Sequence, residues 1–145
     1  MKAKLKFLIA ILLFSVATAN ADTIKKIDFE TIDKGFYSHY KGDNKQHIIE
    51  IYNQEDWQTF WNQHISGTFP PPPLPDIDFK NYIVIVALDE MRSSGGYTLE
   101  IKKITIDTAV ESRPFEIIIQ LNQPGSAAGT IAVMTRPYHI VKIKK

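Results

Sequence analysis

Near the middle of the chain stands the stretch YIVIVAL, which runs from Tyr82 to Leu88. No charged or amide side chain interrupts it, and four β-branched residues follow one another from Ile83 to Val86. A continuous apolar run of this length is typical of a strand that is covered on both faces. We therefore predict that residues 82–88 form a strand in the interior of a sheet.

The segments after this run resemble strands that are buried on one face. In residues 97–106 the apolar positions change parity at Lys102-Lys103, which predicts a β-bulge there. Residues 115–121 alternate regularly and predict another half-buried strand. The last apolar segment, Ile131–Ile143, is interrupted by Pro137, so we expect this strand either to lie at a sheet edge or to be broken at the proline.

The region before YIVIVAL predicts a strand, a helix and a connector. Residues 46–52 predict the strand, and Asn53 with Asp56 three residues later approximates a helix capping box. The prolines of residues 70–75 predict an extended connector, since proline lacks an amide hydrogen and has a fixed φ. The helix, which we expect to end near Gly67, has one apolar face that we interpret as core rather than as a stacking site: Trp57, Phe60, Trp61 and Ile65.

These elements predict a fold class that is mainly β (α+β): an antiparallel β-meander or sandwich with one amphipathic helix packed on it. Short connections between consecutive strands favour the meander. The 145 residues contain no cysteine, so burial alone must hold the fold, and thiol catalysis, cysteine-ligated zinc and disulfides are excluded. We expect a single mature domain over residues 22–145.

The first residues have the pattern of a secretory signal peptide. Three lysines precede the apolar run 7–16, and Ala19-Asn20-Ala21 is a small-x-small cleavage site. The run is too short to span a bilayer, so we expect cleavage before Asp22 and no stable membrane span. An exported chain without disulfides suits a bacterial periplasm or the medium. The formal net charge of +1 gives no support for nucleic-acid binding, which needs a basic surface.

Two glycine-bearing connections are the most site-like feature of the sequence. Alternate connections of an antiparallel meander lie at one end of the sheet, which places residues 89–96 beside residues 123–130. Loops on a rigid sheet often carry binding residues. The pair Gly95-Gly96 is equally what a plain hairpin turn would use. Both interpretations stay open from the residues alone.

The segment Arg92–Ile101 (RSSGGYTLEI) resembles the GGY-plus-strand motif of the PrcB C-terminal domain family. The segment Thr135–Ile143 (TRPYHIVKI) resembles the closing segment of that family, and the resemblance covers residues 46–145. The family is named for a subunit of a bacterial cell-surface protease complex. The resemblance implies a non-catalytic, exported accessory domain that contacts or stabilises a protease.

The partner-binding residues that this hypothesis predicts lie in the two loops and the closing segment: Arg92, Ser93, Ser94, Gly95, Gly96, Tyr97, Gly125, Gly129, Arg136 and Tyr138. The same loops, together with Arg136-Pro137-Tyr138, are also similar to chagasin-type cysteine protease inhibitors. That resemblance implies a glycine-rich loop and an R-P-aromatic element at one end of a β-sandwich. Protease inhibition is therefore an alternative function.

Known catalytic and metal-binding patterns do not occur in the sequence. The four histidines have no metal-like spacing, and we expect them to be scattered over the surface: His39, His47, His64 and His139. No serine lies in a G-x-S-x-G elbow. We predict no catalytic residue, no metal and no cofactor. A small enzyme or ligand carrier remains a second hypothesis, which a pocket lined by two carboxylates or a histidine cluster would favour.

Overall fold

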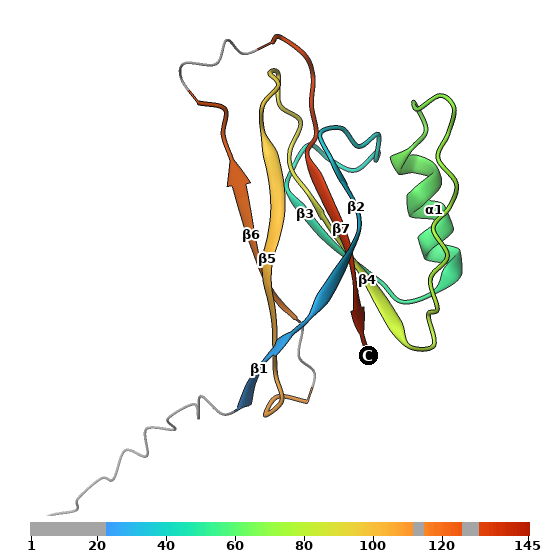
Figure 1. The fold of residues 1–145 in the computed structure, drawn as a ribbon, viewed down its shortest axis with the longest axis vertical. Helices are drawn as coiled ribbons and strands as arrows, with labels where there is room; N and C mark the ends of the chain where they lie inside the picture. The colour runs from blue at the N-terminus through green and yellow to red at the C-terminus, as the bar shows by residue number, and fades with distance from the viewer. Residues whose placement is uncertain (1–22, 112–114, 126–130) are drawn as a thin grey trace, which may run out of the picture.

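A computed structural model describes residues 23–111, 115–125 and 131–145. Within these ranges the chain forms seven strands and one helix (Figure 1). In chain order they are β1 (Ile24–Ile27), β2 (Phe29–Gly35), β3 (His47–Ile51), α1 (Gln54–His64), β4 (Tyr82–Leu88), β5 (Thr98–Asp107), β6 (Glu116–Asn122) and β7 (Tyr138–Lys144). The YIVIVAL run is therefore β4, as predicted.

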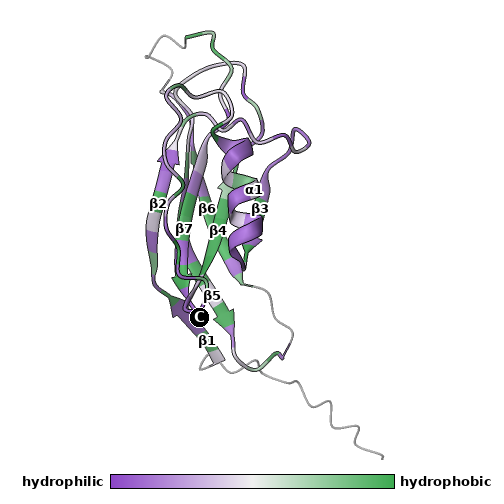
Figure 2. Ribbon diagram, turned by 90° about the vertical axis from the view of Figure 1, so that its right-hand side faces the viewer, coloured by the Kyte–Doolittle hydropathy of each residue, from purple (hydrophilic) through white to green (hydrophobic). Residues whose placement is uncertain are grey.

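The strands form two antiparallel sheets. The first has the order β1-β5-β6 and the second the order β2-β7-β4-β3. One apolar cluster fills the space between the sheets, and another fills the space between the four-stranded sheet and α1. Figure 1 shows the resulting three layers, and Figure 2 shows hydrophobic residues along β4 and β7 in the middle layer. The predicted fold class, mainly β with a helix packed on a sheet, is confirmed.

The strand order differs from that of a consecutive meander. β4 pairs with β3 and β7, so the chain crosses from the second sheet to the first between β4 and β5. β7 lies between β2 and β4, so the interpretation of this strand as an edge is wrong. The other interpretation, a break at Pro137, is confirmed because β7 begins at Tyr138. Both inner strands are almost continuously buried, which requires cover on both faces.

The helix α1 begins as its sequence predicts. The side chain of Asn53 accepts a hydrogen bond from the Asp56 amide at 2.9 Å and donates one to the Asp56 carboxylate at 2.7 Å. Trp57, Phe60 and Trp61 are buried against the four-stranded sheet. The interpretation of this helix face as core is therefore confirmed.

The proline connector is fastened to the helix that precedes it. α1 ends at His64, and residues 71–78 have no regular secondary structure. The indole nitrogen Nε1 of Trp57 donates a hydrogen bond to the carbonyl oxygen of Pro75 at 3.0 Å. The connector thus returns along α1 toward β4 (Figure 1).

Two strands that the sequence analysis did not predict precede β3. β1 (IKKI) and β2 (FETIDKG) are short and charged, and their side chains are exposed or half-buried. Their few apolar positions show no clear alternation. β1 pairs with β5 in the first sheet and β2 pairs with β7 in the second, so this segment joins the two sheets.

Candidate functional site

The described residues of the two loops that the sequence analysis singles out, 89–96 and 123–125, lie at the same end of the molecule (Figure 1). The Arg92 amide donates a hydrogen bond to the Thr135 carbonyl oxygen at 2.7 Å, and the Thr135 amide donates back to Arg92 at 2.8 Å. The Gly95 amide donates to the Ile131 carbonyl oxygen at 3.0 Å, and the Thr135 hydroxyl donates to the Ser94 carbonyl oxygen at 2.9 Å. The β4–β5 loop and the segment before β7 are therefore one hydrogen-bonded unit.

One glycine of this unit has a backbone shape that other residues rarely adopt. Gly96 has a φ of +89°, and a Cβ added there would lie 2.6 Å from the Cβ of Pro124. The φ of Gly95 is not positive, so only the second residue of the glycine pair requires glycine for its backbone angle. Gly125 faces open space, and Gly129 lies outside the described residues.

Arg92 points back to its own loop. Its guanidinium donates two hydrogen bonds to the Asp89 carboxylate, at 2.9 and 3.1 Å, and it pairs with Glu90 at 2.8 Å. It also lies 5.0 Å from the centre of the Tyr97 ring. Asp89 is 1% exposed, and a buried carboxylate without such a bidentate partner is costly. Arg92 therefore stabilises the loop in addition to any contact with a partner.

Arg136 and Tyr138 lie inside the protein. Arg136 is 2% exposed. Its guanidinium donates hydrogen bonds at 2.7–3.4 Å to four backbone carbonyl oxygens, those of Tyr40, Asp43, Lys45 and Asp89. The Tyr138 hydroxyl donates to Asp33 Oδ2 at 3.0 Å. Both residues hold neighbouring loops and strands together, so the R-P-aromatic element of the chagasin likeness is not presented at the surface.

Five apolar side chains are exposed on two neighbouring loops at this end of the molecule, which the sequence analysis did not predict. We call this group the apolar tip: Phe36, Tyr37, Ile131, Val133 and Met134. The Arg136 amide donates to the Phe36 carbonyl oxygen at 2.9 Å and so joins the two loops. The signal in the sequence was the run IAVM at residues 131–134, which ends before β7 begins and is drawn as hydrophobic beside the grey trace in Figure 2.

A serine, a histidine and an aspartate meet between α1 and the four-stranded sheet. His64 Nδ1 lies 2.8 Å from Ser38 Oγ, and His64 Nε2 lies 3.5 Å from Asp33 Oδ2. These are the residue types of a hydrolytic triad. Ser38 and His64 are each 3% exposed, so a substrate could not reach the hydroxyl in this structure. The group ties α1 to β2, and the hydrogen bond from His64 holds the pKa of Asp33 below its usual value.

A second buried histidine links the two sheets. His139 Nδ1 accepts a hydrogen bond from the Ile101 amide at 2.9 Å, next to the register shift that confirms the bulge predicted at Lys102-Lys103. Its Nε2 therefore carries the proton and donates to Thr31 Oγ1 at 2.8 Å. The expectation of surface histidines is wrong for His64 and His139, because both fill positions where the fold brings distant polar groups together.

We expect the stability of the protein to fall as the pH is lowered from about 6.5 toward the pKa of His139. Burial and the charge of Lys34 lower this pKa in the folded protein, so the unfolded chain takes up a proton first as the pH falls. Urea unfolding between about pH 5 and pH 7 measures the loss. In His139→Gln the amide oxygen can still accept the hydrogen bond from Ile101, but this loss of stability with falling pH should disappear. Equal slopes of the free energy of unfolding against pH in the two proteins would contradict the assignment.

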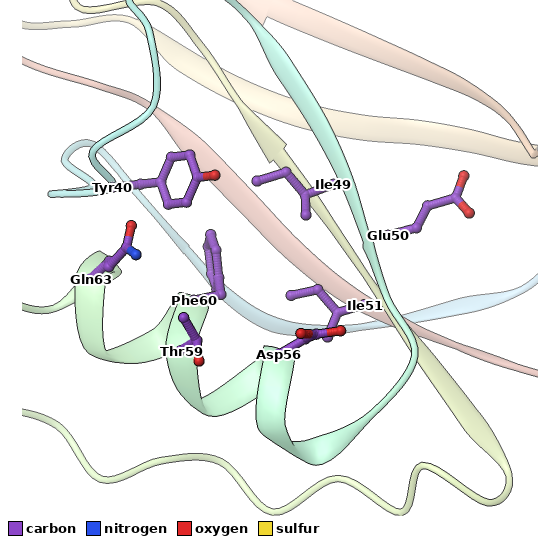
Figure 3. A pocket seen from close by; sticks show the side chains of 8 residues that line it. All are labelled: Tyr40, Ile49, Glu50, Ile51, Asp56, Thr59, Phe60 and Gln63. Carbon is purple, nitrogen blue, oxygen red and sulfur yellow. The ribbon is translucent and has the colours of Figure 1, made fainter.

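A shallow pocket of about 310 Å³ lies between α1 and β3 (Figure 3). It is lined by Tyr40, Ile49, Glu50, Ile51, Asp56, Thr59, Phe60 and Gln63. Two carboxylates belong to this set, but they do not converge. Glu50 points away from the cavity and accepts a hydrogen bond from the Tyr52 hydroxyl, which raises the pKa of Tyr52 to about 12. Asp56 is bound to Asn53 at the start of α1, so the pocket has no acid–base pair aimed into it.

Two further features concern residues 23–111, 115–125 and 131–145. These ranges contain no group of three or more histidine, cysteine, aspartate or glutamate residues placed to hold a metal ion. Over the same ranges, no helix combines the length and the apolar character that crossing a membrane would require.

Comparison with known families supports the resemblance seen in the sequence. Residues 83–144 match the family described as PrcB C-terminal. The match extends from β4 to β7 and includes the β4–β5 loop, while α1 and strands β1–β3 lie outside it. No curated protein and no solved structure matches the chain. The resemblance to the PrcB C-terminal family is thus confirmed, and it is residues 83–144 that carry it.

Proposed function

We propose that the protein is a non-catalytic accessory domain that binds a protein partner, a protease or a subunit of a protease complex, through the apolar tip. The observation that carries the proposal is the exposure of Phe36, Ile131 and Met134 at one end of the fold, where Ile131 is 75% exposed. Single exposed apolar residues are normal, but a group of them on adjacent loops indicates an interaction surface. The match to the PrcB C-terminal family supports the association with a protease.

The loops of the tip are held in place without a partner. Backbone hydrogen bonds join Arg92 to Thr135 and Gly95 to Ile131, and the Asp89–Arg92 pair closes the β4–β5 loop. Contact residues that are already ordered lose less conformational entropy on binding. In this proposal the buried members of the predicted partner-binding set support the surface, and the side chains of the apolar tip contact the partner.

We expect Ile131→Ser/Met134→Ser to reduce recovery of the partner about tenfold or more, because loss of an anchor at the centre of an interface costs more than about 1 kcal/mol. The measurement is quantitative mass spectrometry after capture from a bacterial envelope extract with the chain from Asp22 as bait. The melting temperature should change little, since both side chains are exposed.

The matched control is Ile118→Ser, which removes an exposed isoleucine from β6. This variant should recover the partner as well as the unsubstituted protein does. Equal recovery by the tip variant and the control would contradict the assignment of the binding surface to the tip.

We also propose that the chain is exported and acts in the periplasm or the medium. The support is the order of charged, apolar and small residues in positions 1–21, which lie outside the described residues. N-terminal sequencing of the protein from an envelope fraction should begin at Asp22. A chain in that fraction that begins at Met1 would contradict cleavage.

A further inference from the structure

The strand β3 lies at an edge of the four-stranded sheet. It pairs with β4 on one side, and no strand of the described residues pairs with its other side. In an antiparallel pair, every second residue directs its backbone N–H and C=O away from the neighbouring strand. Within His47–Ile51, these outward groups can form a ladder with one more strand.

The pocket between α1 and β3 lies beside this edge (Figure 3). Its inner wall is apolar and rigid, because Phe60 is buried, stacks on Trp57 at a ring distance of 6.0 Å and lies 5.5 Å from the Tyr40 ring. Ile49 of β3 completes the apolar wall, and Thr59 and Gln63 of α1 form the opposite rim. A cavity of about 310 Å³ has room for one or two apolar side chains of a bound peptide.

The charge of the pocket restricts what can bind there. Asp56 is the acid at this pocket, because the Glu50 side chain points away from the cavity, and none of the eight lining residues is a base. An apolar side chain of the peptide would enter the pocket, and a neighbouring lysine or arginine would lie near the Asp56 carboxylate. A second copy of β3, with the sequence HIIEI, contains no lysine or arginine to place there.

We propose that β3 and the pocket form a second protein-binding site, which takes an extended peptide segment as an added strand. The segment carries an apolar residue next to a lysine or arginine. Main-chain pairing with a sheet edge supplies affinity in such complexes, and the pockets for alternate side chains supply specificity. This site is separate from the apolar tip and does not depend on the function proposed for it.

The test uses a phage-displayed library of random linear decapeptides, selected on the full chain from Asp22. The selected peptides should share an apolar residue flanked by lysine or arginine. Binding of the corresponding synthetic peptides should slow hydrogen exchange of the β3 amides and leave those of the edge strand β6 unchanged. Selection of no binding peptide, or protection confined to other strands, would overturn the proposal.

Two matched variants of α1 locate the peptide. Gln63→Trp fills the pocket and should weaken peptide binding at least tenfold, whereas Gln58→Trp makes the same change at an exposed helix position outside the lining and should leave it unchanged. Equal binding by both variants would overturn the proposal. Self-association of the unsubstituted protein that Gln63→Trp abolishes would also overturn the proposal, since β3 would then pair with a second copy of the chain. Ile131→Ser/Met134→Ser should bind the peptides normally, which separates this site from the apolar tip.

Discussion

Trp57→Ala should lower the free energy of unfolding by about 3–5 kcal/mol, the usual cost of truncating a fully buried aromatic side chain. Trp57 is completely buried, packs on Phe60 and Trp61, and donates to the Pro75 carbonyl oxygen. Its loss therefore opens a cavity beneath α1 and releases the proline connector. Urea unfolding followed by circular dichroism measures the change, because a tryptophan signal would be altered by the substitution itself.

Trp57→Phe separates the two contributions. The ring largely fills the cavity, while the hydrogen bond to Pro75 is lost, so we expect a cost of about 1–2 kcal/mol from the unmade bond and the smaller volume. A Trp57→Ala variant as stable as the unsubstituted protein would mean that the helix does not pack on the sheet as described.

Arg136→Ala should destabilise the protein by about 3 kcal/mol or more. The guanidinium is buried and makes four hydrogen bonds to backbone carbonyl oxygens, and bonds that involve a charged group contribute about 1.5–3 kcal/mol each before the carbonyls regain water. Chemical unfolding gives the loss, and hydrogen exchange should show faster opening of the loop 36–46, which three of these bonds hold.

Arg136→Lys is the informative comparison for this position. A lysine keeps the charge, but its single ammonium cannot reach the same fork of carbonyl oxygens, so most of the loss should remain. Lys102→Ala, at an exposed residue of β5, should change the free energy of unfolding by less than about 0.5 kcal/mol. Full stability of Arg136→Lys would mean that charge alone, rather than the hydrogen-bond geometry, holds the loop.

Features set by neighbouring residues were predictable from the sequence. The YIVIVAL run needs cover on both faces whatever lies beside it, Asn53 caps the helix through a residue three positions away, and the parity change at Lys102-Lys103 is itself the bulge. The pairing of β7 with β2 was not predictable in this way. It depends on residues far apart in the chain, and β2 is too charged to show its alternation.

In the candidate site, too, the predictable features were local and the missed ones depend on residues far apart in the chain. The convergence of the two loops at one end was inferred from strand direction, and the close approach of Gly96 to Pro124 bears it out for the described residues. Loop position and family resemblance suggested that Arg92, Arg136 and Tyr138 contact a partner. The fold uses their polar groups internally, because Asp89, Asp33 and several loop carbonyl oxygens accept their hydrogen bonds. The run IAVM was visible in the sequence, but the exposure of Ile131 and Met134 was not predicted, since apolar residues before a strand usually continue it into the core.

The pairing of β2 with β7 also determines when the fold can be completed. Phe29 pairs with Ile143, which is 114 residues later in the chain. A pairing of this sequence separation has a large loop-closure entropy, and high contact order slows folding. A chain is synthesised from its N-terminus, so β7, the strand between β2 and β4, leaves the ribosome after the other described strands. The larger sheet therefore cannot close before β7 has emerged, and a chain that stops before Tyr138 lacks the strand on which both halves of that sheet depend.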